Sequence, residues 1–121
     1  MAAVSIEELI NEKEAIEARK KRQYDVETSA GTFTMKPPSK SFVAEAMGLS
    51  EGSDEYLVYH CTVSPDLSDK KLQDTYKCVE PTDIVGRLLD PGEISAVAKK
   101  IMQCAGYGKD VRAELHEEVK N

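Results

Sequence analysis

Aromatic residues are scarce in this sequence, which has no Trp, two Phe and five Tyr. Proteins that bind single-stranded nucleic acid stack the bases on aromatic side chains in a basic groove. The only dense basic run here, residues 19–22, contains no aromatic residue. Acidic residues also outnumber basic ones by 22 to 16, and the formal net charge of −6 disfavours contact with a phosphate backbone. We therefore expect no nucleic-acid partner.

Cysteine is also rare, and its placement argues against disulfide or metal sites. Cys61, Cys78 and Cys104 are far apart and form no Cys-x-x-Cys pair, so neither a disulfide framework nor a zinc ribbon is expected. Each lies beside apolar residues, which predicts small buried side chains in a reducing compartment. His60 precedes Cys61, but adjacent side chains point in different directions. We expect no metal and no cofactor.

The two histidines, His60 and His116, offer little for catalysis. Nucleophilic catalysis needs a nucleophile beside a base that a third group orients, and no motif of that kind is evident. The seven glycines never form a phosphate-binding loop. We predict no catalytic residue and no enzyme. The alternative is an enzyme, or a small regulator of an enzyme, whose chemistry would come from dispersed carboxylates or from His60.

Long hydrophobic runs are missing as well. No stretch approaches the roughly 20 apolar residues of a membrane span, and the first residues lead into charge instead of a signal-peptide core. We expect no membrane contact and a cytoplasmic location. What the chain does have is 121 residues, 40% of them hydrophobic, which is enough for a buried core. No repeat or long linker divides it, so we expect one domain, residues 1–121.

The first third predicts a helix followed by a β-hairpin. Ser5 can cap a helix over residues 6–21, with Glu8 completing a capping box. The basic run 19–22 then lies at the negative end of the helix dipole; contact with a partner is the alternative interpretation. Alternating side chains predict a hairpin over residues 23–36, which two prolines end.

Residues 39–119 are expected to be helical. Helix starts are predicted at Ser39 or Ser41, Ser68, Pro81 and Asp90. The clearest amphipathic stripe follows the last of these starts and consists of Ile94, Val97, Ala98, Ile101 and Ala105. A final helical segment begins at Asp110 and carries Val111, Leu115 and Val119 at four-residue spacing.

The block 56–63 suits either a buried strand or a helix, and its helical surroundings favour a helix. The predicted fold class is α+β and mainly helical: an N-terminal helix, one β-hairpin and a bundle of short helices.

A recurring order of motifs runs through residues 63–107. The motifs are Val63–Leu67, Lys71–Gln73 with Tyr76, Glu80–Val85 with Leu88 and Leu89, Pro91–Ile94, and Gly106 with Tyr107. This order resembles the XkdN-like family of phage tail assembly chaperones. The N-terminal part resembles the family more loosely, in its charged helix and its strand pair that ends at prolines.

The resemblance implies a non-structural phage or prophage protein that acts in the bacterial host cytoplasm. Such a protein would bind the tape-measure protein and keep it soluble until tube subunits polymerise around it. The tail tube protein or a second copy of the chain would be further partners, and a frameshift-extended form can exist in such families. A structural component of the tail or connector is the alternative from a different class.

Two apolar stripes are the candidate partner-binding residues. One comprises Ile6, Leu9 and Ile10 on the first helix, and the other Val111, Leu115 and Val119 on the last. A chaperone for an amphipathic client needs an apolar face that the client can cover. Packing of both stripes on the core is the alternative.

Overall fold

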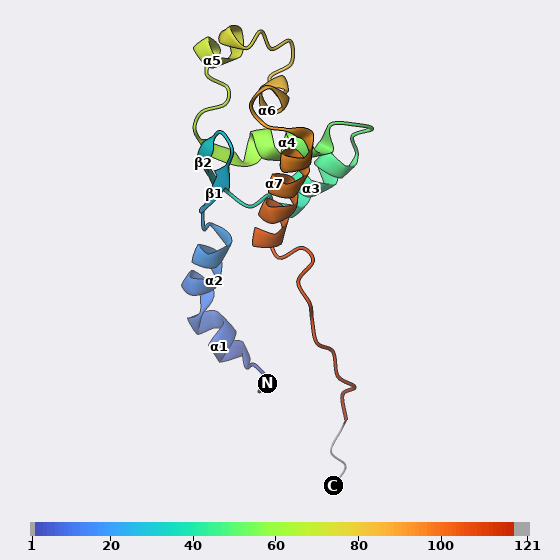
Figure 1. Ribbon diagram of the computed structural model, residues 1–121. Helices are drawn as coiled ribbons and strands as arrows, with labels where there is room; N and C mark the ends of the chain where they lie inside the picture. The colour runs from blue at the N-terminus through green and yellow to red at the C-terminus, as the bar shows by residue number, and fades with distance from the viewer. Residues whose placement is uncertain (1, 118–121) are drawn as a thin grey trace.

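The computed structural model describes residues 2–117 and is mainly helical, with one small sheet (Figure 1). The elements in chain order are α1 (Ile6–Asn11), α2 (Lys13–Lys20), β1 (Tyr24–Thr28), β2 (Gly31–Met35), α3 (Lys40–Met47), α4 (Ser53–Cys61), β3 (Thr62–Ser64), α5 (Lys70–Thr75), α6 (Asp83–Leu88) and α7 (Pro91–Cys104). This confirms the predicted α+β class. The sheet and helices α3 to α7, residues 24–105, are called the body below.

The N-terminal helix is divided into two at Glu12, whose φ of −92° and ψ of 6° interrupt the regular turn. Ser5 caps α1 as predicted, because its Oγ accepts a hydrogen bond from the Glu8 amide at 3.1 Å. The Ser5 hydroxyl also donates to the Glu8 carboxylate. Neither α1 nor α2 buries a residue, so mainly local hydrogen bonds hold these helices. Both extend from the body in Figure 1.

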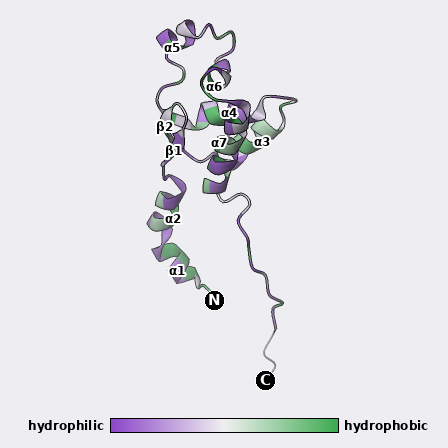
Figure 2. Cartoon of the chain, in the orientation of Figure 1, coloured by the Kyte–Doolittle hydropathy of each residue, from purple (hydrophilic) through white to green (hydrophobic). Residues whose placement is uncertain are grey.

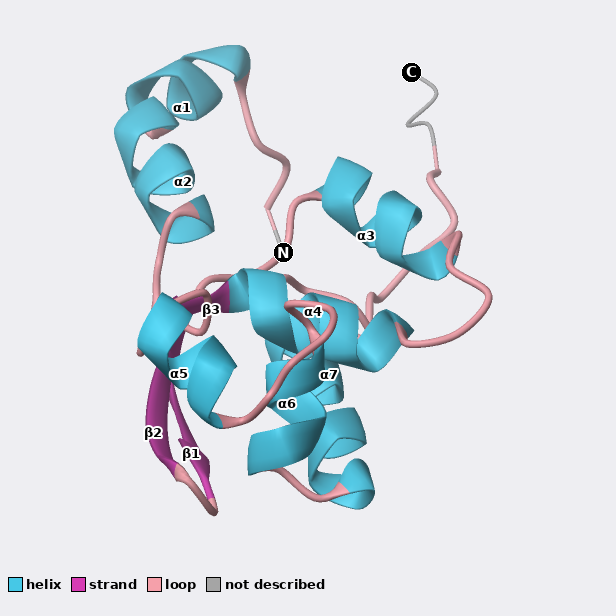
Figure 3. Cartoon of the chain, turned by 90° about the horizontal axis from the view of Figure 1, so that it is seen from above, coloured by secondary structure: helices cyan, strands magenta, loops and turns pink. Residues whose placement is uncertain are grey.

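The predicted hairpin is confirmed, and a third strand joins it. β1 and β2 pair antiparallel with Val26 opposite Phe33, and β3 pairs antiparallel with the other edge of β2. Phe33 and Met35 are buried on one face of β2. The third strand was missed because its three residues are too few to show an alternating pattern. Figure 3 shows the sheet beside the helices of the body.

The ambiguous block 56–63 proves to be both a helix and a strand. Helix α4 continues through Cys61, and Thr62 then adopts extended backbone angles and begins β3. The Thr62 hydroxyl donates to the Val58 carbonyl at 2.6 Å and so satisfies an acceptor in the last turn of α4. The helical prediction is therefore right for residues 56–61 and wrong for Thr62 and Val63.

The core lies where α4 and α7 pack against each other and against the sheet. It is formed by buried apolar residues from most elements of the body: Phe33, Met35, Ala46, Leu57, Val58, Cys61, Leu67, Ile84, Val85, Leu89, Ile94, Val97, Ala98 and Ile101. The α7 stripe is thus confirmed up to Ile101, whereas Ala105 caps the helix and is exposed. Cys61 is buried as expected, but Cys78 and Cys104 are only half-buried.

Two of the predicted helix starts shift by one or two residues. Asp69, not Ser68, caps α5, because its Oδ1 accepts from the Leu72 amide at 3.0 Å while the Ser68 hydroxyl donates to Asp66. Helix α6 begins at Asp83, after Pro81. A carboxylate oxygen binds an orphan amide more strongly than a hydroxyl does, which explains the choice of Asp69. Ser39 caps α3 as one of the two predicted alternatives.

The predicted last helix is wrong: residues 109–117 contain neither helix nor strand and run away from the body (Figure 1). Gly106 and Gly108, with φ of +98° and +77°, end α7 and turn the chain away from it. Val111 and Leu115 are 79% and 89% exposed, so no core contact supports a helix there. Val119, the third residue of that stripe, lies outside the described residues.

The hairpin turn is tied to the start of α7 through Glu93. Its Oε2 accepts from the Ser29 amide at 2.8 Å, and its Oε1 accepts from the Ser29 hydroxyl at 2.6 Å. These bonds favour the ionised carboxylate and lower the pKa of Glu93. They join two segments that are 64 residues apart in the sequence.

We expect this pair to make stability depend on pH. Because the pKa of Glu93 is lower in the folded chain, its contribution is full above the unfolded value of about 4.3 and is lost as pH falls through the folded value. The Tm difference between the wild type and Glu93→Gln should therefore be largest at neutral pH and shrink in acid. Thermal melts at several pH values test this. An equal Tm difference at every pH would contradict it.

Candidate interaction surfaces

The histidine in the apolar block has a packing role. The ring of His60 lies with its centroid 4.4 Å from that of Tyr56, 4.9 Å from that of Tyr59 and 5.4 Å from that of Phe42. Tyr56 donates its hydroxyl to Glu45 Oε1 at 2.8 Å, and this bond raises the pKa of Tyr56. The cluster joins α3 to α4, which is the arrangement of an aromatic packing contact.

The cysteine next to it is equally unsuited to nucleophilic chemistry. Cys61 is buried, and burial raises the pKa of its thiol to about 11, so the sulfur stays protonated at neutral pH. Within residues 2–117, no three His, Cys, Asp or Glu side chains come together in a way that could hold a metal ion. No helix among these residues is long and apolar enough to cross a membrane.

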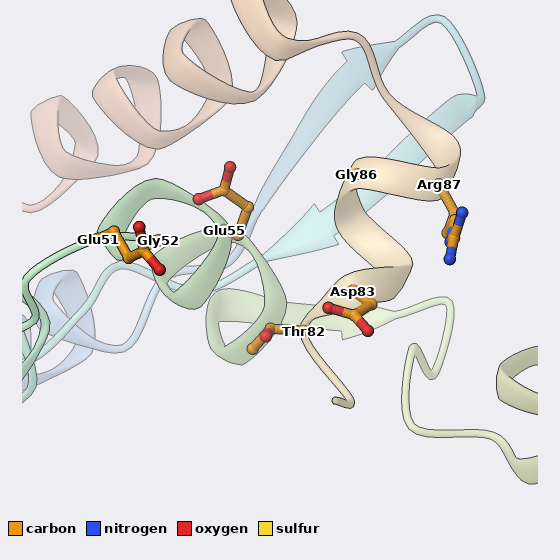
Figure 4. Close-up of a pocket in the computed structure, with 7 residues that line it drawn as sticks. All are labelled: Glu51, Gly52, Glu55, Thr82, Asp83, Gly86 and Arg87. Carbon is orange, nitrogen blue, oxygen red and sulfur yellow. The ribbon is translucent and has the colours of Figure 1, made fainter. Parts of the chain in front are cut away.

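A polar hollow of about 540 Å³ lies between the start of α4 and α6 (Figure 4). Glu51 and Glu55 approach it from one side, and Asp83 and Arg87 from α6. Figure 4 shows Arg87 directed away from both glutamates. Asp83 already accepts hydrogen bonds from two backbone amides of its own turn. The hollow therefore exposes acidic side chains to water, and their arrangement does not indicate a ligand.

The α1 stripe is the clearest uncovered apolar surface. Ile6, Leu9 and Ile10 are 73%, 45% and 66% exposed, and Val4, just before the helix, is exposed as well. Figure 2 shows both hydrophobic and hydrophilic residues along α1. Several large apolar side chains gathered on one exposed helix are typical of a protein-binding surface, whereas scattered single ones are not. The stripe does not pack on the core.

The second predicted stripe does not form a helical face. Val111 and Leu115 are exposed, but they lie in segment 109–117, which forms no helix, so their four-residue spacing does not create a helical face. The α1–α2 segment and this tail leave the body at the same end in Figure 1.

A basic groove was not anticipated from the sequence. It has a volume of about 720 Å³ and lies between the end of α2, the start of β1, the segment before α3 and the end of α7. The cations that line it are Arg19, Lys20, Arg22, Lys40 and Lys109. The basic run 19–22 was the only sequence signal for it, and the fold adds two lysines from distant positions.

Comparison with known proteins agrees with the order of motifs in the sequence. The model of the family described as phage XkdN-like tail assembly chaperone protein matches residues 6–120. The crystal structure of the protein YqbN is similar in fold, with a TM-score of 0.58 and 20% sequence identity, over 71% of this chain and 86% of that one. No curated protein gives a significant match. Since the family model spans nearly the whole chain, this protein belongs to the XkdN-like family of phage tail assembly chaperones.

Proposed function

We propose that this chain binds the tape-measure protein through α1 and keeps it soluble in the bacterial host cytoplasm during tail assembly. Family membership establishes a role in phage tail assembly, and the proposal names the client and the surface. The single observation that carries it is that α1 buries none of its residues although it presents Ile6, Leu9 and Ile10.

The chemistry of α1 suits a client with amphipathic helices. An apolar row on one helix can pair with the apolar row of another, and each helix then removes the other's row from water. Glu7 and Glu8 lie between the apolar residues and stay hydrated. The formal net charge of −6 helps to keep the free chaperone soluble while the apolar row is uncovered.

The proposal also has a physical basis in the weak attachment of α1. A helix that buries no residue loses little packing when it reorients toward a client. The ordering of such a segment on binding costs entropy, which lowers affinity and allows release. Release is what an assembly chaperone needs when tube subunits replace it. The tail tube protein and a second copy of this chain are further partners in this proposal.

Co-expression with the tape-measure protein from the same genome tests the proposal. We expect the tape-measure protein to move into the soluble fraction and to co-purify with a tagged copy of this chain. The tape-measure protein expressed alone is the control. If it stays insoluble and unbound, and this chain is found in purified phage particles, a structural role in the tail replaces the chaperone role.

A further inference from the structure

The basic groove has an unusual charge composition for this protein. Five of the chain's 16 basic residues line it, and none of the 22 acidic residues does so among the residues described. All five cations are exposed, and within residues 2–117 none of them forms an ion pair. Like charges held close together repel one another, and a bound anionic group relieves that repulsion.

Helix stability does not account for this arrangement. Arg19 and Lys20 lie in the last turn of α2, where a cation complements the helix dipole. Lys40 is the first residue of α3, at the positive end of that dipole, where a cation is unfavourable. Lys109 follows the glycines that end α7 and lies in no helix. Helix stabilisation therefore does not explain why Lys40 and Lys109 lie with the other cations in this groove.

We propose that this groove binds an acidic peptide segment of a partner protein. Its volume of about 720 Å³ falls in the range of roughly 300 to 1,000 Å³ typical of sites that enclose a small ligand. Ser39 and Gln103 add uncharged hydrogen-bonding groups, and Pro37 and Pro38 add apolar contact. Carboxylates entering the groove would meet several cations at once.

A peptide fits these observations better than a nucleic acid. Tyr24 is the one aromatic residue in the described lining, so successive bases of a nucleic acid would lack aromatic rings to stack on. The chain outside the groove is strongly acidic, and a long polyanion that left the groove would be repelled there. A short acidic segment can end within the groove and avoid that repulsion.

The groove is separate from the surface of the proposed function. None of its lining residues belongs to α1, so loss of one activity need not affect the other. The chain's own tail starts at the groove with Lys109 and carries Glu114 and Glu117. It is the competing occupant that the experiment has to distinguish.

The test is a fluorescence anisotropy titration of the full-length chain with a labelled Glu-Ser repeat peptide. A peptide with Gln in place of Glu and a single-stranded DNA of equal charge serve as comparison probes. We expect the acidic peptide to bind, and its affinity to fall as salt shortens the screening length from about 30 Å to about 8 Å. The Gln peptide and the DNA should bind far more weakly.

Three double variants locate the binding. Arg22→Glu with Lys40→Glu should weaken peptide binding by about tenfold or more. Lys70→Glu with Lys71→Glu removes the same charge from exposed positions on α5 and should change it by less than about twofold. Arg22→Gln with Lys40→Gln should have an intermediate effect, which keeps the test valid if the charge reversal disturbs folding.

Three results would overturn the proposal. Equal losses in the groove variant and the α5 variant would indicate general electrostatic attraction. DNA binding tighter than peptide binding, and lost in the groove variant, would make the groove a nucleic-acid site. If only Glu114→Gln with Glu117→Gln allows the peptide to bind, the groove holds the chain's own tail and not a partner.

Discussion

Replacing Ile101 with Ala is expected to lower the free energy of unfolding by about 2 to 5 kcal/mol. Ile101 lies on the buried face of α7 and is fully inaccessible to water. The substitution loses the apolar contacts of the removed carbons and leaves a cavity between α7 and its neighbours, which close packing cannot fill without strain. Domains of this size are stable by only about 5 to 15 kcal/mol, so the loss is a large share of the total.

The matched control is Ile10→Ala on α1. Ile10 is 66% exposed, so the same change of side chain should alter the free energy of unfolding by about 0.5 kcal/mol or less. Urea denaturation followed by circular dichroism measures both values, with equal slopes expected if the unfolded states are alike. Similar losses in the two variants would show that α7 does not form the core or that α1 is packed.

Replacing Ile6 and Ile10 together with Gln is expected to abolish co-purification of the tape-measure protein. Each isoleucine that a client covers contributes about 1.5 to 3 kcal/mol through burial. Losing most of this burial free energy at both positions should weaken binding by about 2 to 4 kcal/mol, which is about 30-fold to 1,000-fold in affinity. Gln keeps a helix-compatible, uncharged side chain, so α1 itself should still form.

The control for this pair is Val79→Gln, because Val79 is 89% exposed and lies away from α1, between α5 and α6. It removes an exposed apolar side chain from another place and should leave client binding unchanged. The unfolding free energy of both variants should stay near that of the wild type. Undiminished binding by the Ile6 and Ile10 variant would exclude the α1 stripe as the client surface. Binding lost equally in both variants would indicate non-specific hydrophobic association.

Local patterns predicted the elements whose stability depends on near neighbours in the chain. The alternation before and after Gly31 predicted the hairpin, and the Asp90-Pro91 start with its apolar stripe predicted α7. The order of motifs over residues 63–107 also identified the family. Strand β3 was not predicted because it depends on pairing with β2, which lies far away in the sequence.

The tail shows why periodicity is not sufficient for a helix. Val111 and Leu115 have the spacing of an amphipathic helix, as the buried residues of α7 do, yet only α7 has a surface to pack on. A short helix in water is marginal unless an apolar face is buried or, as with Ser5 before α1, a side chain caps its first turn. Of the candidate partner-binding residues, Ile6, Leu9 and Ile10 share one helix in the structure, whereas Val111 and Leu115 do not.

The sequence by itself determined the hairpin, the main helix, the N-terminal cap at Ser5 and the family, because these depend on residues within a few positions of one another or on their order. Only the tertiary structure decided which apolar stripe is covered and where α4 ends and β3 begins. It also decided that Arg22, Lys40 and Lys109 line one groove. Those outcomes depend on contacts between distant segments, and a linear pattern contains no information on which segments meet.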